Sequence, residues 1–419
     1  MRFRIGIFGL IAVCAVANAL AGAKDKPVSA QESVTVPAVI DHNRVIIDVE
    51  VAGANGSSQK ARAWVDNGDP EMGISRRLAA VLGLNVSCDG NTCSAPPPES
   101  ITIGGMKFPL FEIKTVEIPL NAKTVLAAGV HADLKIPSTV LRRYDVLVDF
   151  PGRKFSIGSP GTIAFHGTSA KVLVNPENGL IQIPGQIEKK KFNLALDLGS
   201  SISFLAQDVF DDLSAAHADW PQMTGAVGPA NMWGLEEEPK WKLMRLDRLQ
   251  YGPLFLTNVA VVEFPKDRME FFQKRAGVAT SGVLGSQALL NYRVGMSYAR
   301  STVYFEIGRT FNFPDFDVIG LVLRPEDDGR YTVLGAAEAQ GTQSEPSGAD
   351  GVQPGDHLVA VDQIPVRGAT MGQVWALLGA TPGKERRLTI ERGGKEFLVV
   401  AKAQHFLPEV PDGDGKKKK

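Results

Sequence analysis

The sequence predicts a mainly β protein, on three observations. Most of the chain between residues 34 and 307 consists of short runs rich in Val, Ile and Phe, separated by Gly, Pro and Asn, which is the pattern of strands joined by turns. Helical signals in this region are few, and the clearest lie at residues 75–84, 206–217 and 286–292. Two of the strands end in the same Asp-x-Gly pattern, which indicates an internal repeat.

Residues 1–23 have the pattern of a secretory signal peptide. Arg2 and Arg4 precede an apolar run, and small residues that fit an A-x-A cleavage site follow it. The run is short for a spanning helix, so a retained anchor is the less favoured alternative, and no stable membrane span is expected after the signal is removed. The sequence therefore predicts a periplasmic or secreted protein.

Cys88 and Cys93 flank a short polar stretch, Asp-Gly-Asn-Thr. In an oxidising compartment such a pair predicts a disulfide that closes a small loop. A metal site would need further ligands, and no histidine is close in the sequence, so no metal is expected here. The net charge of −1 gives no electrostatic reason to expect a nucleic-acid partner.

The repeat consists of a first copy, residues 34–158, and a second copy, residues 162–308. In each copy an apolar strand ends at an aspartate, Asp66 or Asp197, and a glycine follows two positions later. An aliphatic residue and a helical segment come next, and the two copies also end alike. The alternative is a pair of unrelated turn aspartates. The second copy carries an insertion at residues 219–242, which is either a lip facing a substrate or a loop packed on its own body.

Composition changes after Gly308, which indicates a separate third unit at residues 312–404. It contains a turn followed by a buried strand at residues 352–366, and an amphipathic helix is expected at residues 370–380. Residues 405–419 end in four lysines and predict a disordered tail.

At these residues the chain resembles known families. The repeat resembles retropepsin-like and pepsin-like aspartic proteases, which carry Asp-Thr/Ser-Gly in each half and a hydrophobic-hydrophobic-Gly motif late in each half. Asp66-Asn67-Gly68 and Asp197-Leu198-Gly199-Ser200 match the first motif, and Val283-Leu284-Gly285 matches the second. The third unit resembles a PDZ domain, with Ile319-Gly320-Leu321-Val322 as its carboxylate-binding loop. The resemblance implies a bilobal pair of β-barrels followed by a PDZ-like α/β domain.

The resemblance also implies a chemistry. Asp66 and Asp197 would share one proton, activate a water and hydrolyse peptide bonds, with no metal or organic cofactor. Gly68 and Gly199 would let backbone approach the carboxylates, and the Ser200 hydroxyl would hydrogen-bond Asp197. The substrate would be a peptide or an unfolded protein, and the PDZ-like unit would bind peptide C-termini. Two lobes in one chain imply a monomer.

Three features depart from the family pattern. Leu198 has no polar atom with which to brace the two loops, although Asn67 could supply some hydrogen bonding. Asp69 adds a third carboxylate where a small residue is usual, and it would raise the proton affinity of the pair further. The late motif of the first copy should lie near residues 134–137, which hold no hydrophobic-hydrophobic-Gly. The alternative function is therefore a catalytically degenerate protein that binds peptides in the same cleft.

Overall fold

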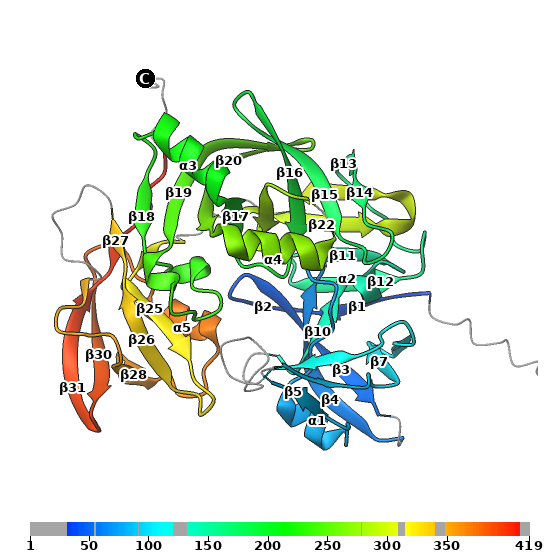
Figure 1. Cartoon of the computed structure of the whole chain (residues 1–419), viewed down its shortest axis with the longest axis horizontal. Helices are drawn as coiled ribbons and strands as arrows, with labels where there is room; N and C mark the ends of the chain where they lie inside the picture. Colours follow the sequence, from blue (N-terminus) through cyan, green and yellow to red (C-terminus); the bar gives the residue numbers. More distant parts are fainter. Residues whose placement is uncertain are drawn as a thin grey trace, which may run out of the picture. The chain divides into compact units, whose positions relative to one another are not determined.

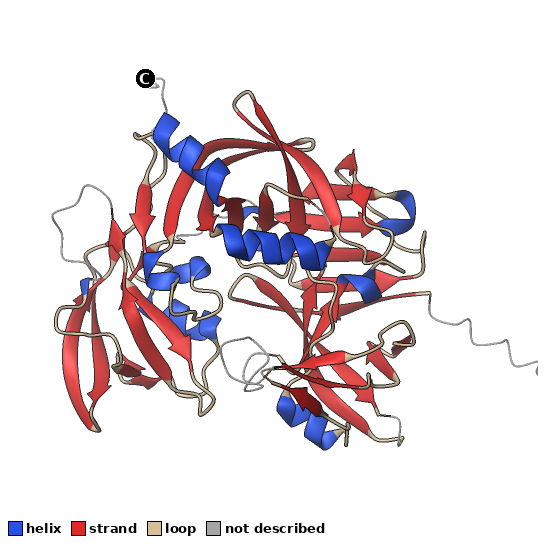
Figure 2. Ribbon diagram, in the orientation of Figure 1, coloured by secondary structure: helices blue, strands red, loops and turns tan. Residues whose placement is uncertain are grey.

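The computed structural model describes residues 32–53, 56–90, 92–119, 132–277, 279–308, 315–339 and 348–410. The predicted signal segment and residues 411–419 of the predicted tail lie outside these ranges. The described part of the chain is mainly β, as predicted, and short helices are interspersed among the strands (Figure 2). The α-helices within it are α1 (Arg76–Val81), α2 (Ser138–Leu141), α3 (Gln207–Ala216), α4 (Lys266–Ala276) and α5 (Met371–Leu378). Short 3-10 helices add η1 (Gly228–Ala230), η2 (Glu238–Lys240), η3 (Ser286–Leu289) and η4 (Tyr298–Arg300).

An antiparallel sheet joins the two copies of the repeat. Its strand order is β1-β12-β11-β22-β23-β13, so each copy contributes three strands and the copies meet where β11 pairs with β22. The strands are β1 (Ser33–Pro37), β11 (Asp145–Asp149), β12 (Lys154–Gly158), β13 (Thr168–Lys171), β22 (Tyr292–Ser297) and β23 (Thr302–Ile307). Because the equivalent ends of the two copies occupy equivalent places in one sheet, the structure supports the internal repeat read from the sequence.

The first copy builds a second sheet of order β10-β4-β3-β7-β8, to which β2 adds by pairing with β3. Its strands are β2 (Val39–Asp41), β3 (Arg44–Ala52), β4 (Ser58–Asp66), β7 (Ser100–Ile103), β8 (Met106–Pro109) and β10 (Leu134–Pro137). A small sheet of β5 (Ser87–Asp89), β6 (Thr92–Ala95) and β9 (Val116–Ile118) lies beside it. The predicted disulfide is confirmed, since Cys88 on β5 is bonded to Cys93 on β6.

The second copy closes part of its sheet into a barrel. The strand order is β14-β15-β16-β21-β17-β20-β19-β18-β27, and β15 pairs with β19 as well as with β16. The second-copy strands are β14 (Leu173–Val174), β15 (Ile181–Ile187), β16 (Lys190–Asp197), β17 (Ser203–Ala206), β18 (Gln222–Thr224), β19 (Lys242–Tyr251), β20 (Leu254–Phe264) and β21 (Gly282–Gly285). The strand β27 (Glu338–Ala339) comes from the third unit, so the sheet continues across the boundary between the two (Figure 1).

The third unit is a sheet of order β25-β26-β28-β30-β31 with β29 paired to β28. Its strands are β25 (Leu321–Pro325), β26 (Tyr331–Ala336), β28 (His357–Val361), β29 (Ile364–Pro365), β30 (Glu385–Arg392) and β31 (Lys395–Lys402). The expected helix is α5, which begins at the capping box of Thr370 and Gln373 and buries Met371, Val374 and Leu378. One continuous apolar core contains residues of this unit and of the second copy, such as Leu323 and Phe204.

The packed part of the chain extends beyond the expected start of the tail at residue 405. Strand β32 (Gln404–His405) pairs with β24 (Asp317–Val318), and the Phe406 and Leu407 side chains after it are buried. The boundary was predicted from charge and composition. These averages do not detect two apolar residues, Phe406 and Leu407, that directly precede a polar C-terminal segment. Among the described residues, no helix has the length and apolar character to cross a membrane.

Candidate active site

The two repeated aspartates end equivalent strands. Strand β4 ends at Asp66 and runs parallel to β10, which places Pro137 opposite Asp66. Strand β16 ends at Asp197 and runs parallel to β21, which places Gly285 opposite Asp197. The segment at residues 134–137 therefore stands where the late motif of the first copy was expected, with proline in the place of glycine.

The two Asp-x-Gly loops lie face to face. A Cβ atom built on Gly68 would lie 2.0 Å from Cγ of Asp197, and one built on Gly199 would lie 2.3 Å from Oδ1 of Asp66. Any side chain at either glycine would overlap the carboxylate of the other copy, so close approach is the physical reason for glycine at both positions. The structure thus brings together the four residues that the sequence singled out.

Both carboxylates line one small cavity of about 120 Å³. Its walls combine the loops with apolar and charged side chains from distant parts of the sequence: Trp64, Asp66, Gly68, Asp69, Pro70, Asp197, Gly199, Ser200, Met232, Trp233, Phe272, Arg275 and Ala276. Met232 and Trp233 belong to the predicted insertion, which therefore packs on the body and also faces the cavity.

Asn67 braces the two loops from one side. Its side-chain Nδ2 donates to the Leu196 carbonyl at 2.8 Å, and its Oδ1 accepts from the Leu198 N–H at 2.7 Å. The Asn67 side chain is fully buried, as is that of Leu198, which packs into the apolar core. One amide, with a donor and an acceptor, thus makes both cross-loop bonds. The missing hydroxyl at Leu198 is therefore compensated by Asn67.

The two aspartates differ in their hydrogen bonds. Asp66 accepts from the Gly68 N–H at 3.0 Å, whereas one oxygen of Asp197 accepts from the Gly199 N–H at 2.8 Å and the Ser200 N–H at 3.0 Å. The predicted bond from the Ser200 hydroxyl is replaced by this backbone bond, because the hydroxyl donates to the Ile202 carbonyl at 2.7 Å.

These surroundings separate the proton affinities of the pair. Burial and the nearby Asp197 charge raise the pKa of Asp66 well above its ordinary value. Burial also raises the pKa of Asp197, to about 6, but the two backbone N–H groups stabilise its charged form and limit the rise. Asp66 is therefore the carboxyl that keeps a proton, and Asp197 is the first to ionise.

Asp69 does not act as an unpaired third carboxylate. Lys135 Nζ lies 2.6 Å from its Oδ2, and Arg275 Nε donates to its Oδ1 at 3.2 Å. Burial alone would raise the pKa of Asp69, but the two cations outweigh burial and the pKa is lowered. As expected, the charge of Asp69 raises the pKa of both Asp66 and Asp197. The sequence reasoning missed Lys135, which lies opposite Trp64 on the neighbouring strand and pairs with Asp69.

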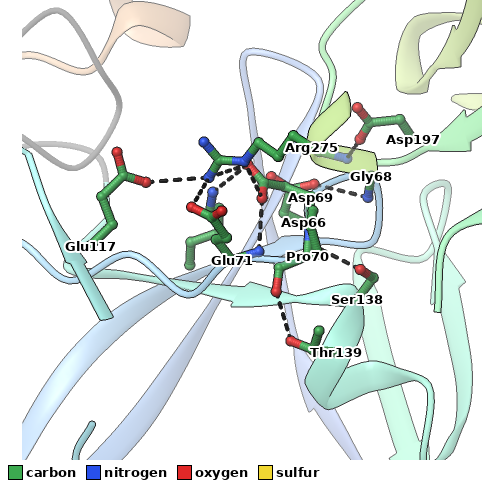
Figure 3. A network of polar contacts seen from close by, with 12 residues as sticks. Asp66, Gly68, Asp69, Pro70, Glu71, Glu117, Ser138, Thr139, Asp197 and Arg275 are labelled. Atoms are coloured by element: carbon green, nitrogen blue, oxygen red, sulfur yellow. Dashed lines mark hydrogen bonds and ion pairs between the residues drawn. The ribbon is translucent and has the colours of Figure 1, made fainter. Parts of the chain in front are cut away.

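Arg275 was missed by the sequence reasoning. It lies in the last turn of α4 and also forms ion pairs with Glu71 at 2.8 Å and Glu117 at 3.3 Å, so it links the second copy to acidic groups of the first (Figure 3). The helix could have been found from Pro265 before it and Gly277 after it, which are typical boundary residues. The acidic partners of Arg275 in the first copy are distant in the sequence and leave no such local signal.

Arg44 is a second cation that the sequence reasoning missed. Its guanidinium lies 5.1 Å from the centre of the Trp64 ring and donates to the Met232 carbonyl at 3.3 Å. Burial lowers the pKa of Arg44 to about 10, against the attraction of nearby carboxylates that include Asp66 and Asp197. This cation favours the charged form of Asp197.

The expected carboxylate-binding loop lies elsewhere, at the start of β25. Ile319, Gly320, Leu321 and Val322 are all buried, and none of them lines the cavity of the aspartates. Beyond them, the N–H and C=O of Leu323 are both bonded to the side chain of Asn231. In this structure, therefore, the protein itself occupies part of the β25 edge.

Within the described ranges, no cluster of three or more His, Cys, Asp or Glu side chains has the arrangement of a metal site. Comparison of the chain with protein-family models found no match, and comparison with curated proteins found none either.

Proposed function

We propose that this protein is an aspartic endopeptidase in which Asp66 and Asp197 act as a pair. The observation that carries the proposal is the face-to-face packing of the two loops, in which each glycine lies against the carboxylate of the other copy. Two buried carboxyl groups at such close quarters do not both ionise, so they hold one proton between them.

The mechanism follows from the difference between the two carboxyl groups. Ionised Asp197 takes a proton from a water, and the water oxygen bonds to the carbonyl carbon of the peptide. Protonated Asp66 donates to the carbonyl oxygen, which stabilises the tetrahedral intermediate. The proton held by Asp197 then passes to the amide nitrogen, the C–N bond breaks, and Asp66 recovers its proton as the carbonyl re-forms.

Two further contacts favour an active pair. The Asn67 brace holds both loops in register through buried hydrogen bonds. The ion pairs of Asp69 with Lys135 and Arg275 offset part of the negative charge beside the pair, and the remaining repulsion from Asp69 raises the pKa of Asp66 and Asp197.

One observation favours the alternative, a peptide-binding protein without activity. The cavity of about 120 Å³ is smaller than the roughly 300–1,000 Å³ of ordinary ligand sites, so a peptide needs the walls to move. If the cavity opened far enough to admit a peptide but did not align a water with the peptide carbonyl, the protein would bind the peptide without hydrolysing it.

A secreted or periplasmic location accompanies the proposal, supported by the leader pattern and by the disulfide. The substrate is a peptide or an unfolded protein, and both aspartates come from one chain, so a monomer suffices. In the proposal the third unit binds peptide C-termini along β25.

The test is cleavage of a reduced, alkylated protein between about pH 3 and pH 7, with products identified by mass spectrometry. Wild type and Asp219→Asn, an exposed control in the second copy, should give the same fragments. Asp197→Asn and Asp66→Asn should each give none. Peptide binding without cleavage at any pH would favour the alternative, and cleavage that survives in both variants would refute the proposal.

A further inference from the structure

The segment Gly228–Lys240, called the bridging segment here, contacts both candidate sites. It begins with η1 and ends with η2, inside the insertion of the second copy. The described side chains of Asn231 and Glu238 within it are fully buried, although both are polar. Buried polar groups are stable only with partners, so the partners of these two residues show what the segment does.

Asn231 occupies the edge of β25 as a peptide group would. Its Nδ2 donates to the Leu323 carbonyl at 2.9 Å, and its Oδ1 accepts from the Leu323 N–H at 3.0 Å. Strand β25 ends the strand order of its sheet, so its outward N–H and C=O groups are open to another strand. A primary amide offers the same donor and acceptor as a backbone amide, so Asn231 stands in for a residue of an added strand.

Other contacts order the bridging segment internally and fasten it to β25. The Glu238 carboxylate accepts from Asn231 and from the Trp233 N–H. Arg324 on β25 forms an ion pair with Glu236. Gly234 has φ +65°, and a Cβ built there would lie 2.9 Å from the Arg324 Cα. The segment therefore follows β25 at close range rather than touching it at one point.

The next residues of the segment contact the aspartate site. The Met232 sulfur accepts from the Ser201 N–H at 3.3 Å and lies 3.5 Å from the hydroxyl oxygen of Ser200. Met232 and Trp233 both line the cavity that contains Asp197. Since neighbouring Cα atoms lie about 3.8 Å apart, a backbone displacement that takes Asn231 off β25 also shifts Met232.

We propose that the bridging segment masks the β25 edge and couples it to the aspartate cavity, so that an extended peptide pairing with β25 displaces Asn231 and draws Met232 and Trp233 from the cavity wall. The two occupants exclude each other, because both need the N–H and C=O of Leu323. Withdrawal of the two apolar side chains enlarges the cavity. The consequence for cleavage rests on the proposed function, whereas the exclusion and the coupled movement do not.

Hydrogen–deuterium exchange of the full chain, read by mass spectrometry, tests the coupling without any need for cleavage. Asn231→Ala removes the amide, and Glu236→Lys places a cation against Arg324 while leaving the buried groups unchanged. Glu396→Lys is the control, because it makes the same charge change at an exposed position on β31, the opposite end of the sheet.

Both test variants should raise exchange about tenfold at residues 321–325, since two hydrogen bonds of ordinary net strength are lost or weakened. Exchange should also rise at residues 198–204, next to Asp197, whereas the control should match wild type. Faster exchange at residues 321–325 alone would overturn the coupling, and unchanged exchange at residues 321–325 would overturn the masking.

The second measurement is binding of fluorescein-labelled hexapeptides that end in Val, Leu or Phe with a free carboxylate, followed by anisotropy. Asn231→Ala and Glu236→Lys should bind the best of them about tenfold more tightly than wild type and the control. Equal affinity in all four proteins would overturn the exclusion. Peptide binding and hydrogen exchange are independent of hydrolysis. A protein without proteolytic activity would therefore refute the proposed function without contradicting this inference.

Discussion

Replacement of Asn67 by leucine is the sharpest perturbation of the brace between the two loops. Leucine has the same branching and the same number of side-chain heavy atoms as asparagine and also occurs at the equivalent position, Leu198. The change therefore removes polarity and keeps the branched shape, in a larger side chain. The Asn67 side chain is fully buried and makes both cross-loop hydrogen bonds. The variant therefore leaves the Leu196 carbonyl and the Leu198 N–H without their partner.

The expected cost follows from those two groups. A buried polar group without a partner costs about 1–3 kcal/mol, so the two together should lower the free energy of unfolding by roughly 2–6 kcal/mol. This is a large fraction of the roughly 5–15 kcal/mol that stabilises a typical domain. The double variant Asn67→Thr with Leu198→Thr supplies a hydroxyl on each loop and should recover most of the loss.

Urea unfolding, followed by tryptophan fluorescence and by circular dichroism, measures the change. Asn193→Leu is the control, because Asn193 is exposed on β16, the strand that ends at Asp197. The control should lie within about 0.5 kcal/mol of wild type. If Asn67→Leu were as stable as the control, the two hydrogen bonds would not brace the loops and the account of the site would fail at this point.

The other predictions concern charge and close packing at the same site. Because the pKa of Asp197 is raised to about 6, the folded protein binds a proton more tightly than the unfolded chain, and stability falls as pH rises from about 4 to about 6. Asp197→Asn should remove this loss and unfold at higher urea than wild type at pH 7, by about 2 kcal/mol allowing for partial exposure, with little difference at pH 4. Gly68→Ala should destabilise the protein by a few kcal/mol, roughly 3, because its methyl group would overlap Asp197; an unchanged melting temperature would contradict the close approach of the loops. The lowered pKa of Asp69 stabilises the protein above its ordinary titration range and is lost in acid, so Arg275→Gln should cost about 1 kcal/mol at pH 7 and less at pH 3. A cost independent of pH would show that Arg275 acts through packing alone.

The strand pattern and the aspartates were predictable from the sequence because their signals are local. Alternating apolar residues, glycines and a repeated Asp-x-Gly can be read within a few positions of one another, and the repeat doubles the signal. The structure pairs β4 with β10 and β16 with β21 in equivalent registers, as two copies of one unit should.

The supporting contacts were not predictable because they join residues that are distant in the sequence. Lys135 and Asp69 are 66 residues apart, and Arg275 and Asp69 are 206 apart. Asn231 and Leu323, on either side of an expected domain boundary, are 92 apart. Asp69 looked anomalous in the sequence because the cations that neutralise it are distant along the chain. Asn231 carried no local signal at all, because its partner lies in another unit.

Titration of the two carboxyl groups tests the central claim most directly. With ¹³C label at aspartate Cγ, the signals of Asp66 and Asp197 can be assigned by their loss in Asp66→Asn and Asp197→Asn, and followed by NMR from acid to mildly alkaline pH. The account predicts one step near pH 6 and a second at markedly higher pH, with the Asp66 pKa falling when Asp197 is replaced by asparagine. Two independent steps near pH 4, unchanged by either substitution, would contradict a shared proton.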